Sequence, residues 1–175
     1  MEISKITEEW LKSQKFEIKK DLTIDGVFMK DLVVHLDDRG DVIELWSTYW
    51  EEYKNGIIGD CKHAYQSATD PGIVKGWHLH EKHTDQFTVT RGKLQICMID
   101  IREKSSTFGN ANSIVMGTAK PRFLKIPPGI LHGWKTLGNT EAIVVNFQSH
   151  CYDPNDEFKF PWDIVLSHIW GPRNG

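Results

Sequence analysis

Histidine side chains gather in one short segment, GIVKGWHLHEKHTDQFTVTRG, in which His78 and His80 are two residues apart and Asp85 follows five residues after His80. In a β-strand, residues two apart point to the same face. His78 and His80 can therefore enter one cavity, and a hairpin would bring Asp85 back opposite them. His132 follows a Pro-Pro-Gly turn in the segment IPPGILHGW and is expected on a later strand of the same cavity.

Two kinds of chemistry fit these side chains. Imidazole has an unperturbed pKa suited to proton transfer near neutral pH, which predicts catalytic roles for His78 and His132. Three imidazoles and a carboxylate also suit a divalent Fe, Mn, Ni or Zn ion with open positions. The predicted metal ligands are His78, His80, Asp85 and His132. The alternative for His80 and Asp85 is a buried hydrogen-bonded pair, and a metal on His78 would prevent that residue from acting as a free base.

Other polar and aromatic residues of these segments have simpler interpretations. His83 lies in the turn 81–84 and is expected to be solvated. Trp77 and Trp134 are expected to pack in the core and to point away from the cavity. Tyr65 and Tyr152 are candidates for the mouth of the cavity, although aromatic residues on strands mostly belong to the core.

Short alternating or β-branched runs fill the chain from Leu22 onward and predict the strands that position these residues. The clearest runs are 42–45, 87–89, 94–101 and 142–147. Turn signals separate them at 38–40, 70–72, 91–92, 127–129 and 137–139. This spacing is typical of an all-β sandwich or barrel.

The two ends of the chain carry helical patterns. Residues 4–13 have apolar residues at helical spacing after a capping-type Ser4 or Thr7. Apolar residues in 164–170 favour one more amphipathic turn or short helix over the barrel. We therefore expect one domain, 1–175, with a helical appendage at 1–20, a barrel at 21–160 and a C-terminal cover at 161–175.

Composition excludes several classes of function. At 175 residues, a single domain needs no disulfides or structural metal for its core. The formal net charge of -3 gives no reason to expect a nucleic-acid partner. No run approaches the roughly 18 apolar residues of a membrane span, and the charged start lacks a signal-peptide core. Cys61, Cys97 and Cys151 are too few and too far apart for a disulfide framework, which predicts a soluble protein of the reducing cytoplasm.

The histidine segments resemble the two cupin motifs. Gly72, His78, His80, Asp85 and Gly92 have the spacing of the first motif, with Asp where cupins usually carry Glu. Pro127, Gly129 and His132 resemble the centre of the second, although Thr136 stands where that motif has Asn. The resemblance implies a cupin-type antiparallel jelly-roll β-barrel that encloses one ligand cavity.

A closer resemblance, over some 140 residues, is to the dTDP-4-dehydrorhamnose 3,5-epimerase family of sugar-nucleotide cupins. The segments that carry it are IDGV (24–27), DRG (38–40) with Glu44, KGWH (75–78), DIR (100–102) followed by STFG (106–109), PG (128–129) with HG (132–133), and YDP (152–154) with Glu157.

This resemblance implies a function. The protein would epimerise or isomerise a nucleotide-linked keto-sugar in polysaccharide-precursor biosynthesis, by proton abstraction α to the ketone and without a required cofactor. His78 stands at the position of the family's base, and a histidine also occupies the position of His132. The substrate, a nucleotide-diphosphate sugar, is expected to contact Arg39, Glu44, Lys75, Ser67, Asn146 and Tyr152.

A homodimer is expected because strand 24–30 would otherwise leave an exposed sheet edge.

The departures from the family concern catalytic positions. Asp85 replaces a family lysine, Ile96 a buried carboxylate, and Asn146 the tyrosine acid, while His80 stands where the family has glutamine. These changes leave two alternatives open. One is a metal-dependent cupin enzyme, either an oxygenase or a metal-assisted isomerase, and the other is a non-catalytic sugar-binding cupin.

Overall fold

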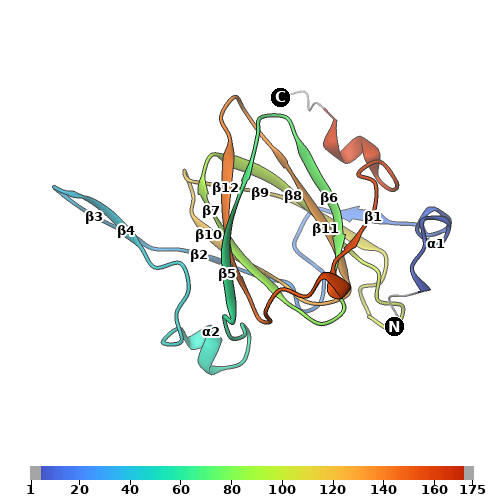
Figure 1. Ribbon diagram of the computed structural model, residues 1–175, viewed down its shortest axis with the longest axis horizontal. Helices are drawn as coiled ribbons and strands as arrows, with labels where there is room; N and C mark the ends of the chain where they lie inside the picture. Colours follow the sequence, from blue (N-terminus) through green and yellow to red (C-terminus); the bar gives the residue numbers. More distant parts are fainter. Residues whose placement is uncertain (1–4, 172–175) are drawn as a thin grey trace.

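The structure is a computed structural model that describes residues 5–171, and it consists mainly of β-strands in two facing sheets (Figure 1). The six-stranded sheet contains, in spatial order, β1 (Glu17–Lys19), β9 (Asn110–Gly117), β8 (Lys93–Asp100), β11 (Ile130–Thr136), β6 (Val74–Leu79) and β13 (Phe158–Lys159). The five-stranded sheet contains β2 (Phe28–Asp31), β10 (Arg122–Ile126), β7 (Asp85–Arg91), β12 (Ala142–Gln148) and β5 (His63–Thr69). The predicted all-β fold is confirmed.

Strand pairing within both sheets is antiparallel, except that β1 runs parallel to β9. The sheets lie face to face as a jelly roll, and no ladder within residues 5–171 closes them into a continuous barrel. The cavity therefore lies between two sheets, and side chains from both can reach it.

Strand β8 shows how the core holds the sheets together. Leu94, Ile96 and Met98 face the interior between the sheets, whereas Cys97 and Ile99 face the outer side of the six-stranded sheet. All five are fully buried, so this strand has no solvent face. Burial of each large apolar side chain contributes about 1.5–3 kcal/mol.

Segments from both ends of the chain cover that outer side. Helix α1 (Glu8–Ser13) begins after Thr7, whose hydroxyl accepts a hydrogen bond from the Trp10 amide, and it buries Leu11. Ser4, the other expected cap, lies outside the described residues. The 3-10 helix η3 (Ser167–Trp170) packs Ile169 and Trp170 onto the same cluster. The predicted short helical segments at both ends are present, and none of the helices described is long and apolar enough to span a bilayer.

A two-stranded hairpin, β3 (Val34–Asp37) and β4 (Gly40–Ile43), projects away from the sheets (Figure 1). Its apolar side chains are unusually exposed, with Leu36 at 78% and Val42 at 68%. A short helix, α2 (Glu51–Lys54), follows, and Trp50 before it packs edge-to-face on Phe123 of β10. The hairpin thus exposes more of its apolar surface than the strands of the two sheets do within residues 5–171.

Candidate active site

A pocket between the two sheets collects most of the polar side chains singled out in the sequence. Its lining residues are Tyr65, Ser67, Lys75, His78, His80, Asp85, His132, Trp134 and Glu157. The six-stranded sheet supplies the imidazoles of His78 and His132, and the five-stranded sheet supplies Tyr65 and Asp85. Polar side chains from both sheets thus meet in one cavity.

His78 and His132 are direct partners in the ladder between β6 and β11. Gly133 allows the two strands to approach closely, because a Cβ there would lie 2.7 Å from the carbonyl oxygen of Lys75. The register shifts just after His132, and Trp134 turns its ring parallel to His78, with ring centroids 6.2 Å apart. The prediction that Trp134 points away from the cavity is wrong: it lies two residues after His132 and so shares its face.

The half-buried His78 has a carboxylate partner to which the sequence assigned no role. Its Nδ1 lies 3.3 Å from Oε1 of Glu157, a residue that follows the 3-10 helix η2 (Pro154–Asp156). The hydrogen bond with His78 lowers the pKa of the Glu157 carboxyl, so Glu157 accepts the Nδ1 proton as a carboxylate. The Nε2 lone pair of His78 is then left to take up a proton.

His80 and His132 both direct their Nε2 atoms at the carboxylate of Asp85. Nδ1 of His80 lies 2.8 Å from the carbonyl oxygen of Asp156, and Nδ1 of His132 lies 3.0 Å from that of Ile130. Because carbonyl oxygens only accept, both Nδ1 atoms carry hydrogen. The two Nε2 atoms lie 3.4 Å and 3.1 Å from Oδ2 of Asp85.

The buried Asp85 keeps its negative charge. Burial opposes ionisation, but hydrogen bonds with His132, His80 and His83 hold the pKa of Asp85 well below its usual range. Burial lowers the pKa of His132, whereas for His80 the neighbouring Asp85 outweighs burial and raises the pKa. The pocket floor therefore holds one carboxylate surrounded by imidazoles.

The expectation that His83 is solvated is wrong, since the residue is only 6% exposed. Its Nδ1 lies 2.9 Å from Oδ2 of Asp156, and its Nε2 lies 3.0 Å from Nε2 of Gln148. Asp156 also accepts the backbone amides of residues 81–83, so η2 anchors the turn. Ligand atoms of His80, His83 and Asp85 lie within 4.8 Å of one another, a grouping that includes His83 and not His78.

Lys75 and Ser67 lie at the same pocket and join the two sheets. Nζ of Lys75 donates to Oγ of Ser67, 3.0 Å away, and to the carbonyl oxygen of Ala68, 2.6 Å away. Burial lowers the pKa of Lys75, yet its hydrogen bonds go to neutral oxygens. Its positive charge thus has no contacting carboxylate within the described part of the chain.

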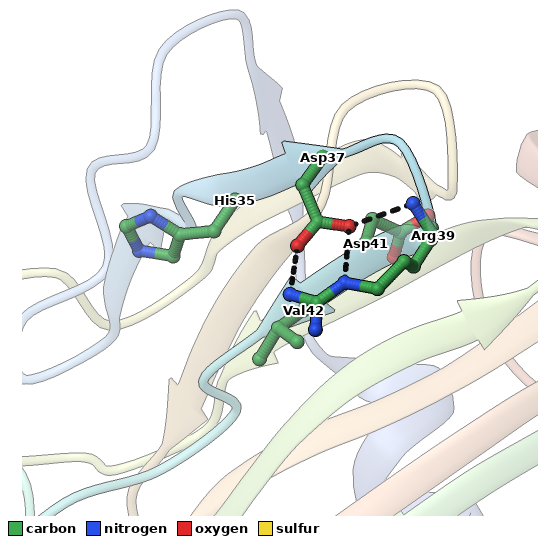
Figure 2. Close-up of a pocket in the computed structure, with 6 residues that line it drawn as sticks. His35, Asp37, Arg39, Asp41 and Val42 are labelled. Atoms are coloured by element: carbon green, nitrogen blue, oxygen red, sulfur yellow. Dashed lines mark hydrogen bonds and ion pairs between the residues drawn. The ribbon is translucent and has the colours of Figure 1, made fainter.

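Three of the expected substrate contacts lie away from this pocket. Arg39 stands in the turn of the projecting hairpin, where its guanidinium pairs with Asp37 (Figure 2). Glu44 is exposed after β4 and accepts a hydrogen bond from Trp50 Nε1. Tyr152 is 63% exposed after β12. Asn146, in contrast, adjoins the pocket and hydrogen-bonds to Tyr65 and Asp85, which line it.

Sequence reasoning missed the groups that orient the histidines. Glu157 belongs to a segment quoted for the family resemblance, but Asp156 and Gln148 carried no signal at all. Their roles depend on the return of η2 and β12 to the turn 81–83, across more than 60 residues of sequence. No local pattern encodes such a contact.

A jelly roll with a pocket of imidazoles, carboxylates and a lysine between its two sheets defines a protein that binds a small polar ligand. The family model described as dTDP-4-dehydrorhamnose 3,5-epimerase matches residues 21–170. The chain belongs to this family, which confirms the resemblance seen in the sequence and the prediction of a sugar-nucleotide epimerase, an isomerase acting on carbohydrates.

Relatives and solved structures agree with this assignment. The spore coat polysaccharide biosynthesis protein SpsL of Bacillus subtilis is 36% identical over 142 residues, covering 80% of this chain and 91% of the relative. The probable low-salt glycan biosynthesis epimerase Agl13 of Haloferax volcanii is 33% identical, covering 80% and 89%. The crystal structure of a dTDP sugar isomerase from Desulfovibrio desulfuricans superposes with a TM-score of 0.75 at 25% identity, covering 82% of this chain and 90% of that one. The cupin-type jelly roll is therefore confirmed.

Proposed function

We propose that this protein epimerises a nucleotide-linked keto-sugar in the synthesis of a polysaccharide or glycan precursor. The observation that carries the proposal is the pairing of His78 with Glu157 at the wall of the pocket, 3.3 Å apart. Glu157 holds the Nδ1 proton, so Nε2 of His78 can remove a proton from the carbon next to the ketone. Relatives whose names refer to polysaccharide and glycan biosynthesis support the pathway class.

The product of this abstraction is an enolate, whose negative charge needs preorganised donors. The ammonium group of Lys75 supports the binding of the diphosphate, because it lies in the same pocket as His78 and its hydrogen bonds go only to neutral oxygens. The family description and the name of the isomerase at 25% identity both refer to dTDP sugars, which supports a thymidine nucleotide.

Solvent exchange tests this function directly. We expect the protein to incorporate deuterium from D2O next to the ketone of dTDP-4-dehydrorhamnose, as followed by proton NMR. Related 4-keto sugars on other nucleoside diphosphates extend the test. A folded protein that binds such a nucleotide sugar but exchanges no proton would favour the non-catalytic sugar-binding alternative.

The homodimer is also a proposal, and the projecting hairpin supports it. Leu36 and Val42 expose apolar surface that a second copy would bury, and β2 and β5 are edge strands of their sheet. A second copy is also what would bring Arg39 to a histidine pocket, since in its own chain the hairpin extends away (Figure 1). Light scattering should give twice the 20.2 kDa chain mass, and Leu36→Asp with Val42→Asp should shift it to the monomer. A monomeric unmodified protein at micromolar concentration would contradict the dimer.

A metal-assisted reaction is the second candidate function, because His80, His83 and Asp85 fit a divalent cation. The Nδ1 atoms of both histidines face acceptors, so a metal would bind at their Nε2 atoms. At Nε2 of His83, the ion would replace the present contact with the Gln148 amide. His132 also directs Nε2 at Asp85. When bound, the ion would supply positive charge to an oxyanion.

His78 does not belong to the group of His80, His83 and Asp85. Metal binding and proton abstraction therefore do not compete for one imidazole. Metal analysis of the purified protein tests the arrangement, together with the visible spectrum of the Co²⁺-loaded protein. A metal content that EDTA removes and that His83→Gln lowers supports it. Absence of metal with full exchange activity contradicts it.

We also propose a cytoplasmic location. No disulfide joins Cys61, Cys97 and Cys151 within residues 5–171, which supports a reducing compartment. Fractionation of the cells that produce the protein tests this.

A further inference from the structure

Tyr65 and Asn146 are direct cross-strand partners on β5 and β12 of the five-stranded sheet. The phenol hydroxyl lies 3.0 Å from Nδ2 of Asn146, and the tyrosine lines the same pocket as His78 and His132. The sequence alone offers only a choice between core and cavity mouth for Tyr65. Its contacts give it a more specific position, next to the groups on the pocket floor.

The direction of the hydrogen bond matters. Oδ1 of Asn146 accepts the backbone amide of Gln86 at 3.0 Å, which determines the orientation of the amide group. Nδ2 then donates both to the Tyr65 hydroxyl and to Oδ1 of Asp85, which lies 2.7 Å away. The hydroxyl oxygen of Tyr65 is therefore an acceptor in this contact, and its own hydrogen has no acceptor among the hydrogen bonds of residues 5–171.

The phenol holds that hydrogen at physiological pH. Burial, followed by the charge of Asp85, raises the pKa of Tyr65 to about 12, while the hydrogen bond from Asn146 acts in the opposite direction. Tyr65 is thus a neutral donor before reaction, and the Asn146 amide stabilises the phenolate that forms when the proton leaves.

Tyr65 and His78 lie on the two facing sheets, on opposite sides of the pocket. His78 belongs to β6 in the six-stranded sheet, and Tyr65 belongs to β5 in the five-stranded sheet. A sugar ring between the sheets would present one face to each residue. Inversion of a carbon centre requires removal of a proton from one face and delivery to the other.

We propose that Tyr65 is the catalytic acid that delivers a proton to the sugar carbon on the face opposite His78. This inference rests on the proposed function. His78 takes the proton of the broken C–H bond, whose electron pair passes into the enolate. The enolate carbon then forms a new C–H bond with the Tyr65 proton, leaving an imidazolium and a phenolate. The phenolate regains a proton from water and the imidazolium releases one, so the net change is the configuration of the carbon.

The test separates proton exchange from inversion. Tyr65→Phe and wild type are incubated with dTDP-4-dehydrorhamnose in D2O, and NMR follows both deuterium incorporation and the appearance of the epimer. We expect Tyr65→Phe to lose inversion by roughly 10²–10⁴-fold, while exchange catalysed by His78 falls less than about tenfold. Tyr49→Phe, at a tyrosine that is 84% exposed, is the matched control and should keep both rates.

Each other outcome has a defined meaning. Undiminished inversion by Tyr65→Phe, or equal loss of exchange and inversion, overturns the role of Tyr65 while leaving the proposed function standing. Absence of exchange by wild type with dTDP-4-dehydrorhamnose and with UDP- and GDP-linked 4-keto sugars overturns the proposed function and the role of Tyr65 together.

A second variant covers the case in which Tyr65→Phe does not fold. Incorporation of 3-fluorotyrosine at position 65 keeps the hydroxyl and lowers the phenol pKa. The alkaline limb of the kcat profile should then move to lower pH. An unmoved limb overturns the proposal.

Discussion

Nε2 of His132 lies 3.1 Å from Oδ2 of Asp85, while Nδ1 of the same ring lies 3.0 Å from the carbonyl oxygen of Ile130. One imidazole is thus placed between two acceptors. His80 repeats the arrangement: its Nδ1 contacts the backbone carbonyl oxygen of Asp156, and its Nε2 faces Oδ2 of Asp85. Asp85 is the common acceptor, and the amides of Asn146 and Gln148 donate to its other oxygen. The carboxylate organises the pocket floor.

Asp85→Ala should therefore destabilise the protein strongly. The substitution leaves two buried imidazoles and two buried amides without their acceptor, and loss of one partner of such a group costs about 3–5 kcal/mol. Urea unfolding at neutral pH measures the change. Asp31→Ala is the control, because Asp31 makes exposed ion pairs with Lys120 and Arg122 and should cost at most about 1 kcal/mol. Equal losses for the two variants would contradict the organising role of Asp85.

His78→Asn should lower the exchange rate by roughly 10²–10⁴-fold, because the variant lacks the imidazole that takes up the proton. Binding of the nucleotide sugar should survive, since His78 is not the proposed phosphate contact. Steady-state kinetics and calorimetry separate the two effects. A folded His78→Asn protein that exchanges protons at the wild-type rate would remove His78 from catalysis.

Lys75→Ala should weaken the binding of dTDP by roughly 10- to 100-fold, the value of a charge-assisted contact with a phosphate. The fold should persist, because the lysine bonds only to Ser67 Oγ and a backbone carbonyl. Titration calorimetry gives the affinities, with Lys120→Ala as a control for the loss of one surface charge. Equal affinity of all three proteins would exclude Lys75 from the binding site.

His80→Gln separates the cofactor-free reaction from the metal-assisted one. Gln keeps a donor and an acceptor in the pocket, so we expect exchange to stay within about threefold of wild type in the cofactor-free case. If a metal is required, both metal content and rate should fall by about tenfold or more. Metal analysis and exchange rates on the same preparation decide between these outcomes.

Asp100 makes part of the stability depend on pH. Burial opposes its ionisation, but hydrogen bonds from Arg102, Ser105 and Thr107 lower the pKa of the carboxyl. Because the pKa is lower in the folded state, this stabilisation is present above the unfolded value of about 3.9 and disappears as pH falls through the folded value. Asp100→Asn should therefore be less stable than wild type at pH 7, and the difference should shrink toward pH 3. Urea unfolding measures the free energy of unfolding of both proteins across this pH range. A difference between Asp100→Asn and wild type that stays constant would show that the carboxylate charge has no role.

The sequence by itself determined the fold class, the shared face of His78 and His80, and the family. Strand periodicity and turn residues are local properties, and they assign side chains to faces without knowledge of distant contacts. The sequence also indicated a cavity that joins His78, His80, Asp85 and His132, because residues two apart share a face and hairpins bring strands back.

Only the tertiary structure decided which groups orient those histidines. Glu157, Asp156 and Gln148 reach them from segments more than 60 residues away in sequence, through strand registers and loop returns that no local pattern contains. Long-range register also places Tyr65 opposite Asn146. Arg39 lies in the turn of a local hairpin, and only the tertiary structure shows that this hairpin projects away from the pocket (Figure 1). The shared direction of His78 and His80 could be predicted from their spacing, because it depends on one extended segment. The partners of these histidines depend on how separate strands pair and pack.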